Sequence, residues 1–175
     1  MRLLLRDPRV NLNEPGNDGY NALWYCSRWK RLALFQDCIA SGRDVDLGVP
    51  GNEKTDIIGA AREGKTRELV PLLERFQNNP EETRRAVRME IGWYDREAAE
   101  VFALVVFLSD GLLKVGTEIN PAARFFSIAS QLPLELQGVL CFRLVDSGKV
   151  VIPKKVTEKA FRYLAKRIIL LEIPT

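Results

Sequence analysis

The sequence contains no histidine among its 175 residues, and that absence removes several kinds of chemistry at once. Histidine is the commonest general base, the usual zinc ligand, and the partner of serine or cysteine in nucleophile pairs. The Gly-x-Gly-x-x-Gly motif of dinucleotide-binding proteins and the Gly-x-Ser-x-Gly motif of hydrolases are missing as well. We therefore expect no catalytic residues, no metal ligands and no cofactor, and we do not expect an enzyme.

Cysteine and long apolar runs are also scarce. The three cysteines, Cys26, Cys38 and Cys141, are odd in number and lie in apolar patterns without metal-like spacing, which favours small buried thiols in a reducing compartment. The longest apolar run covers residues 101–108, whereas a membrane span needs about 20 residues. Residues 1–5 hold too few apolar residues for a signal-peptide core. We expect a cytoplasmic protein with no membrane partner.

The charges show little segregation along the chain. There are 26 lysines and arginines against 23 acidic residues, a net charge of +3, and the two signs are interleaved. Binding of nucleic acid needs basic residues gathered on one face, so no nucleic-acid partner is expected. A short basic group, Arg84, Arg85 and Arg88, stands beside acidic residues and is interpreted as a solvated helix face.

What the chain does have is a repeated unit, seen best in residues 17–42. A turn signal is followed by apolar positions at helical spacing over residues 22–29 and 32–40. A polar turn and two helices in about 33 residues form the unit of an ankyrin repeat. The stretch resembles that family at Asp18-Gly19 in the turn, at Asn21-Ala22-Leu23-Trp24 in place of Thr-Pro-Leu-His, and at the small pair Cys26-Ser27.

A second unit follows 34 residues later. Residues 60–64, Ala-Ala-Arg-Glu-Gly, resemble the end of the first helix of an ankyrin repeat. Thr66 is expected to cap the second helix through its side chain, and Pro71 would then lie in the middle of that helix and bend it. The resemblance covers residues 3–78. The predicted fold is therefore all-α, with an ankyrin repeat solenoid over residues 1–78.

The first repeat is truncated and begins with Leu3, Leu4 and Leu5, where a capping repeat would have a polar outer face. Two explanations stay open. The chain is a fragment of a longer array, or the leucine edge packs on something, such as a second copy of the chain.

Residues 79–175 are predicted to form a helical C-terminal domain packed on the last repeat. Asn79-Pro80 and Asn120-Pro121 are typical helix starts, with asparagine as the cap and proline in the first turn. Further helices are expected at residues 95–113 and 134–144, and a last helix is expected to be capped by Thr157.

The resemblance implies a non-catalytic module that binds a protein partner through turn tips and concave inner helices. Trp29 is the most suggestive position because the family usually has a polar residue there, but it could instead pack on the connector at residues 44–47 or on the truncated first repeat. The positions carried over from the family are Asn17, Asp18, Tyr20, Arg28, Trp29, Asn52, Glu53, Lys54, Arg62 and Glu63.

An alternative function comes from residues 131–144. Leu132-Pro133-Leu134-Glu135-Leu136 resembles the opening of an F-box, the segment that docks on the adaptor of cullin-type ubiquitin ligases. An F-box-like substrate adaptor would need Leu132, Pro133 and Leu136 exposed, whereas ordinary helix packing would bury the two leucines.

Overall fold

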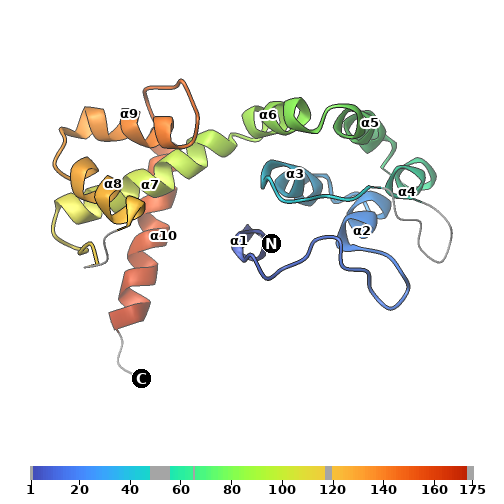
Figure 1. Cartoon of the computed structure of the whole chain (residues 1–175), viewed down its shortest axis with the longest axis horizontal. Helices are drawn as coiled ribbons and strands as arrows, with labels where there is room; N and C mark the ends of the chain where they lie inside the picture. The colour runs from blue at the N-terminus through green and yellow to red at the C-terminus, as the bar shows by residue number, and fades with distance from the viewer. Residues whose placement is uncertain (1, 48–55, 65, 117–119, 173–175) are drawn as a thin grey trace. The chain divides into compact units, whose positions relative to one another are not determined.

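The computed structural model describes residues 2–47, 56–64, 66–116 and 120–172 (Figure 1). All regular secondary structure in these ranges is helical, as the sequence predicts for an all-α protein. The chain divides into two compact units, Met1–Ile91 and Gly92–Thr175. The division falls after the helix that begins at Pro80, whereas the sequence pattern placed the boundary at residues 78 and 79.

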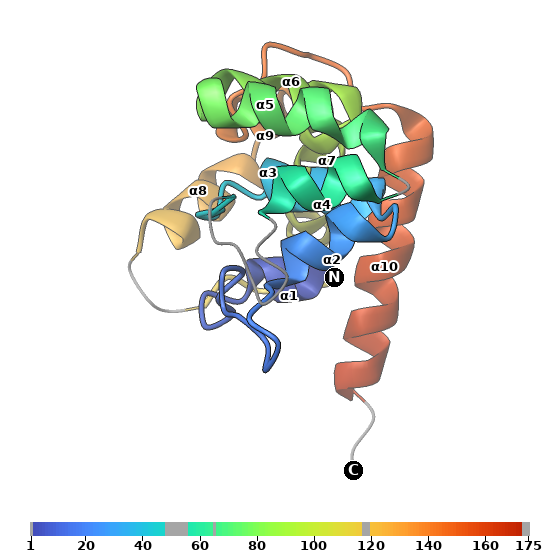
Figure 2. The same cartoon turned by 90° about the vertical axis from the view of Figure 1, so that its right-hand side faces the viewer.

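The first unit is built mostly from short helices. α2 packs on α4, and α6 packs on both α3 and α5 (Figures 1 and 2). The core of this unit is apolar and fully buried at Leu23, Phe35, Ile39 and Leu73. The helices are α1 (Arg2–Arg6), α2 (Ala22–Arg28), α3 (Leu32–Ala40), α4 (Ile57–Glu63), the 3-10 turn η1 (Arg67–Leu69), α5 (Val70–Asn78) and α6 (Pro80–Glu90).

Two arginines of α6 explain why this helix belongs to the first unit. Arg84 Nε donates to the carbonyl of Ile39 at 3.2 Å, and Arg88 Nε donates to the carbonyl of Ala40 at 2.8 Å. The last carbonyls of a helix have no partner inside it, and cations are favourable at that end. The solvated-face interpretation is thus wrong for Arg84 and Arg88 and holds only for Arg85, which is exposed.

The second helix of the second repeat also starts differently from the expectation. Thr66 makes no side-chain cap to the following turn; its hydroxyl oxygen instead accepts from the backbone N–H of Lys30 at 3.2 Å. The 3-10 turn η1 takes up residues 67–69, so α5 begins at Val70 and Pro71 lies in its first turn. Proline is compatible with this position because its missing N–H would have no helical partner there. No mid-helix bend is needed.

The second unit is organised around the long helix α7 (Trp93–Ser109), which packs on α8 (Pro121–Ala129), α9 (Leu134–Leu144) and α10 (Lys154–Glu172). Asn120 caps α8 as predicted, since its side chain accepts from the N–H of Ala123 at 2.8 Å. α10 starts at Lys154, before the expected cap at Thr157, whose hydroxyl donates to the carbonyl of Pro153.

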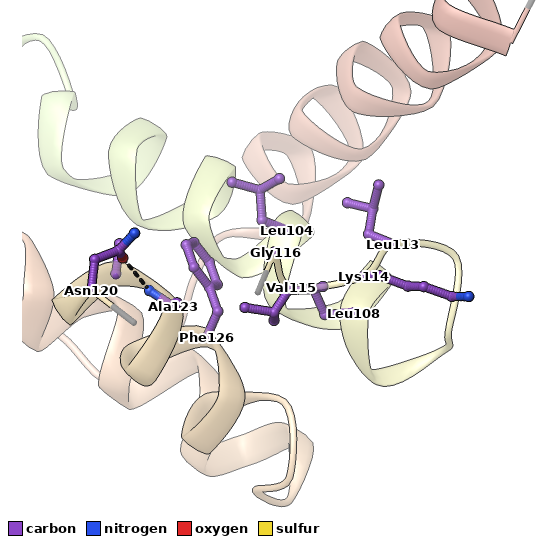
Figure 3. A pocket seen from close by; sticks show the side chains of 10 residues that line it. Leu104, Leu108, Leu113, Lys114, Val115, Gly116, Asn120, Ala123 and Phe126 are labelled. Atoms are coloured by element: carbon purple, nitrogen blue, oxygen red, sulfur yellow. Dashed lines mark hydrogen bonds between the residues drawn. The ribbon is translucent and has the colours of Figure 1, made fainter. Parts of the chain in front are cut away.

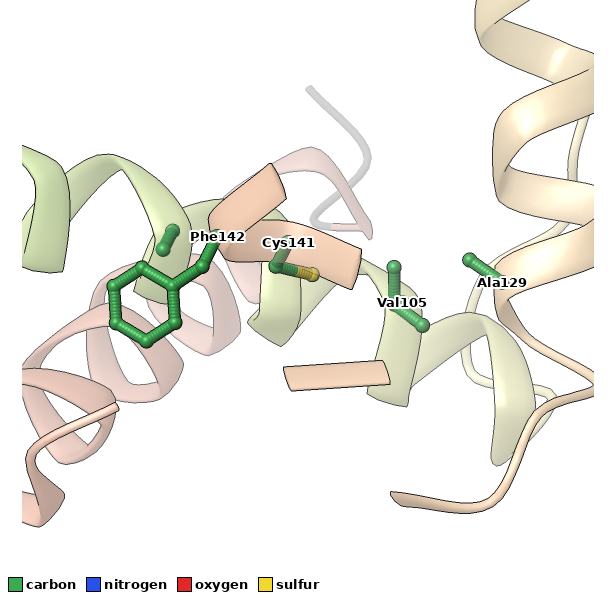
Figure 4. Close-up of a cluster of buried hydrophobic side chains, with 5 residues drawn as sticks. Val105, Ala129, Cys141 and Phe142 are labelled. Atoms are coloured by element: carbon green, nitrogen blue, oxygen red, sulfur yellow. The ribbon is translucent and has the colours of Figure 1, made fainter. Parts of the chain in front are cut away.

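Two buried clusters hold the second unit together. One joins α7, α8 and α9 and contains Ala98, Val105, Ala129, Cys141 and Phe142, all fully buried (Figure 4). The other joins α7 to α10 through Ala99, Ala103 and Ala160. Among the described residues, no helix combines the length and apolar character that a membrane crossing requires.

Candidate protein-binding site

Most of the predicted site residues that the structure describes lie on, or next to, the two helices α2 and α4. Each helix begins at a side-chain cap: Asn21 Oδ1 accepts from Trp24 N at 2.9 Å, and Asp56 Oδ1 accepts from Gly59 N at 2.5 Å. At the far end the two backbones come very close. A Cβ atom on Gly64 would lie 2.7 Å from the carbonyl oxygen of Ala60 and 2.9 Å from that of Arg28. Only glycine permits this approach.

An open pocket of about 540 Å³ lies where the two helices end. It is lined by Arg28, Trp29 and Lys30 from the end of α2, and by Glu63 and Gly64 from the end of α4. Three of the predicted site residues, Arg28, Trp29 and Glu63, are thus brought together. The Trp29 side chain is 65% exposed, which does not fit the alternative of packing on the 44–47 connector.

A row of aromatic rings supports the Trp29 indole from the inside. Tyr20 stacks on Trp24 with ring centroids 3.8 Å apart, Trp24 meets Tyr25 edge-on at 5.4 Å, and Tyr25 contacts Trp29 at 5.5 Å. Such contacts between rings hold side chains in defined orientations. The sequence signal for this row is the spacing of four between Tyr25 and Trp29, which places the two rings on the same side of α2.

Tyr20 itself is not a surface residue. Its side chain is only 6% exposed because it is covered by the stack on Trp24, so the expectation of a contact residue at Tyr20 does not fit the structure. Its role is to support Trp24. The sequence could not distinguish the two roles, since a tyrosine before a helix can turn toward the helix or away from it.

Asp18 and Tyr25 form a polar pair at the opposite end of α2. The Tyr25 hydroxyl donates to the Asp18 carboxylate in a short hydrogen bond. This bond lowers the pKa of Asp18 and raises the pKa of Tyr25, because it stabilises the charged carboxylate and the neutral phenol. Asp18 is thereby engaged inside the unit.

The remaining predicted contact residues are dispersed. Arg62 forms an ion pair with Glu74 of α5 at 2.8 Å, and Asn17 is exposed on the turn before α2. Asn52, Glu53 and Lys54 lie outside the described residues. Among the predicted residues that the structure describes, Arg28, Trp29 and Glu63 therefore converge at the pocket.

Residues 59–66 read Gly-Ala-Ala-Arg-Glu-Gly-Lys-Thr and match the spacing of a phosphate-binding loop. The geometry of that motif requires a loop whose free N–H groups precede a helix. Here Gly59 lies inside α4, and the helix ends where the loop should lead into one. Thr66 is fully buried and accepts from Lys30, while Lys65 is outside the described residues. The match is no evidence of nucleotide binding.

The second unit has an apolar pocket of about 520 Å³ that the sequence pattern did not predict. Figure 3 shows Phe126 and Ala123 of α8 on one side and Leu104 of α7 on another, with Val115 from the connecting loop between them. Its apolar lining follows from the helix faces, but its position depends on how the α7–α8 connection folds. Its lining comprises Leu104, Leu108, Leu113, Lys114, Val115, Gly116, Asn120, Ala122, Ala123 and Phe126.

The two other predicted surfaces are partly exposed. On the N-terminal edge, the Leu4 side chain is 54% exposed and Leu5 is buried, while the side chain of Leu3 is outside the described ones. On α9, Leu136 is 52% exposed and Pro133 is exposed, whereas Leu132 is half-buried.

All three cysteines are buried and carry free thiols. Burial raises the pKa of Cys38 and of Cys141 to about 12, because the thiolate would lose its hydration. Thiols in this condition are poor nucleophiles, as the sequence pattern indicated.

Comparison with known proteins adds no assignment: no family model, curated protein sequence or solved structure matches the chain.

Proposed function

We propose that the chain is a non-catalytic protein-interaction module of the ankyrin type, and that its partner binds at the α2–α4 pocket. The observation that carries the proposal is the Trp29 indole, 65% exposed, held by an aromatic row and placed among Arg28, Lys30 and Glu63. Tryptophan and arginine are the residue types most enriched at the energetic centres of protein interfaces.

The pocket suits binding because its walls are fixed in advance. The close contact of Gly64 with the backbone of Arg28 and the Lys30–Thr66 hydrogen bond set the positions of the two helix ends. A preformed surface loses little conformational entropy when a partner docks. Support for an ankyrin-type unit comes from two successive helix pairs, α2 with α3 and α4 with α5, whose first helices pack side by side.

The test is site-specific crosslinking with a matched control on the same unit. A photoreactive phenylalanine derivative is introduced at Trp29 or at Met89, which is 70% exposed on α6 and remote in sequence from the pocket. A partner crosslinked only from position 29 is then titrated against Trp29→Ala, and we expect its affinity to fall by about tenfold or more, as for an interface hot spot. Identical crosslinks from both positions would refute the site.

A second candidate function is the F-box-like adaptor, favoured by the exposure of Pro133 and Leu136 at the start of α9. In this function the α2–α4 pocket would hold the substrate, and residues 131–144 would dock on the ligase. The half-buried Leu132 supports the docking less well. The adaptor of a cullin ligase should bind the wild-type chain and should not bind Leu136→Asp, while the helical signal of the variant stays unchanged. Absence of binding by the wild type would remove this candidate.

A further inference from the structure

Helix α10 is the most basic segment of the second unit. It carries six lysines and arginines against two glutamates. The rest of the second unit has five basic and seven acidic residues. The positive charge of the unit is therefore concentrated in one stretch of the sequence, which folds as a single helix.

Four of these cations form a straight row, which we call the cationic row: Lys155, Lys159, Arg162 and Lys166. Their spacing of four, three and four residues places them on one face of the helix, and all four side chains are exposed. At 1.5 Å per residue the row is about 16 Å long. None of the four forms an ion pair with a carboxylate of the described residues, and Glu158, one turn from Lys155 and Arg162, is the one acidic residue between the ends of the row.

The opposite face of α10 is already in use. Ala160, Phe161 and Leu164 pack against Ala99 and Ala103 of α7. An amphipathic basic helix binds membranes by inserting its apolar face, and here Ala160, Phe161 and Leu164 of that face are already packed on α7. The packing also keeps the helix rigid, so the row presents its charges at fixed spacing.

The side chains around the cationic row favour a polyanion over a folded protein as the ligand of the row. Protein interfaces draw their binding energy from apolar or aromatic anchors that enter pockets. Among the described side chains of α10, Ile169 is the one exposed aliphatic group, and Tyr163 is partly exposed with the guanidinium of Arg167 5.9 Å from its ring centre. Binding of a nucleic-acid backbone requires only cations in a line, because the release of condensed counterions drives it.

We propose that α10 binds the phosphate backbone of single-stranded nucleic acid through the cationic row. Tyr163, which is 44% exposed, is placed to contact a base beside the backbone. This activity is independent of the α2–α4 pocket, since it involves the second unit alone. It also replaces the expectation of no nucleic-acid partner, which relied on the order of charges in the sequence rather than on their place on a helix.

The test measures binding of a fluorescein-labelled oligothymidylate of about 20 nucleotides to the full chain by fluorescence anisotropy over a range of salt concentrations. With four phosphate contacts, the slope of log K against log salt concentration should be about −3. Arg162→Glu with Lys166→Glu should weaken binding by at least about tenfold and flatten the slope. The control variant is Arg124→Glu with Arg143→Glu, which makes the same change in net charge at exposed positions of α8 and α9. Its affinity for the oligonucleotide should stay within about twofold of the wild-type value.

Three results would overturn the proposal. The first is absence of binding by the wild type at low salt. The second is equal weakening by the two charge-reversed pairs, which would indicate an effect of net charge rather than of the row. The third is tighter binding of a poly-glutamate peptide, or of phosphatidylserine vesicles, than of the oligonucleotide at equal salt, which would assign the row to an acidic protein or to a lipid surface.

Discussion

The two units of this protein are stabilised in different ways. In the first, side chains reach across long stretches of sequence to backbone groups, as when Arg43 donates to the carbonyl of Asp7 at 2.8 Å and Arg88 donates to that of Ala40. In the second unit, the long helix α7 packs against apolar side chains of its neighbours in a cluster that includes Ala98, Val105 and Phe142.

The difference follows from helix length. α2 and α4 have seven residues each, whereas α7 has 17 and α10 has 19. Four N–H groups and four carbonyls at the ends of every helix lack partners inside it, so a seven-residue helix consists mostly of ends. Short helices therefore need side-chain donors and acceptors from elsewhere, while long helices need mainly an apolar face.

The largest effect is expected from a deletion in the apolar core of the second unit. Phe142→Ala should lower the free energy of unfolding by about 3–5 kcal/mol, because it removes a fully buried ring and leaves a cavity. Leu144→Ala, at a 54% exposed position of the same helix, should change it by only about 0.5 kcal/mol. Chemical denaturation measures both, and similar losses would mean that the core does not lie where we place it.

The next largest effect is expected from losing the side-chain hydrogen bonds that Arg84 donates to backbone carbonyls in the first unit. Arg84→Ala should cost about 1.5–3 kcal/mol, since its guanidinium donates to the carbonyls of Ile39 and Arg43. Arg85→Ala, at the exposed neighbouring position, should cost about 0.5 kcal/mol or less. The rate of thiol labelling gives a local measure: Arg84→Ala should accelerate labelling of Cys38 in the first unit more than that of Cys141 in the second. Equal stability of the two arginine variants would contradict the capping role.

Replacing a glycine by alanine should change the free energy of unfolding in opposite directions in the two units. Gly64→Ala should destabilise the first unit by about 1–3 kcal/mol, because the new methyl group would press on the Ala60 and Arg28 carbonyls. Gly138→Ala should stabilise the second by roughly 0.5–1 kcal/mol, since no atom lies within 4 Å of the added Cβ and alanine favours a helix interior. Thermal unfolding of both variants tests the pair. A loss at position 138 would show that α9 packs more tightly than we describe.

The smallest expected effect is the pH response of the Asp18–Tyr25 hydrogen bond. The pKa of Asp18 is lowered from 3.8, so its stabilisation is present above that value and is lost as pH falls through the folded pKa. The pKa of Tyr25 is raised from 10.0, so its stabilisation is present below that value and is lost as pH rises through the folded pKa.

Asp18→Asn should lower the Tyr25 pKa toward its ordinary value, because the hydrogen bond to Asp18 is the largest cause of the upward shift. Ultraviolet titration of the phenols can follow this change, with Tyr25→Phe identifying the signal. An unchanged titration in Asp18→Asn would mean that the bond does not form in solution.

Local signals predicted the helices well and their distant partners poorly. Asn79-Pro80 and Asn120-Pro121 were identified as helix starts because the cap and the proline act within one turn. The roles of Thr66 and Arg84 were missed, because their partners are 36 and 45 residues away in the sequence. Nothing near Arg84 in the sequence distinguishes a side chain that reaches a distant helix end from one in water.

The candidate sites show the same limit. The residues of the α2–α4 pocket were predicted individually at Arg28, Trp29 and Glu63, but their convergence depends on the packing of two helices through Gly64. The cationic row of α10 was missed for a related reason. Its members are separated in sequence by apolar residues and by Glu158, so only a helix aligns them.

The hydrogen bond from the Lys30 N–H to Thr66 has a consequence for the order in which the protein matures. Lys30 adopts a left-handed backbone conformation, with φ of 54°, directly after Trp29. The group that holds it arrives 36 residues later along the chain. During synthesis, Trp29 and the aromatic residues that contact it leave the ribosome before Thr66, so Lys30 gains this hydrogen bond only after Thr66 has emerged. The wall of the α2–α4 pocket at Lys30 is therefore completed later than the indole beside it.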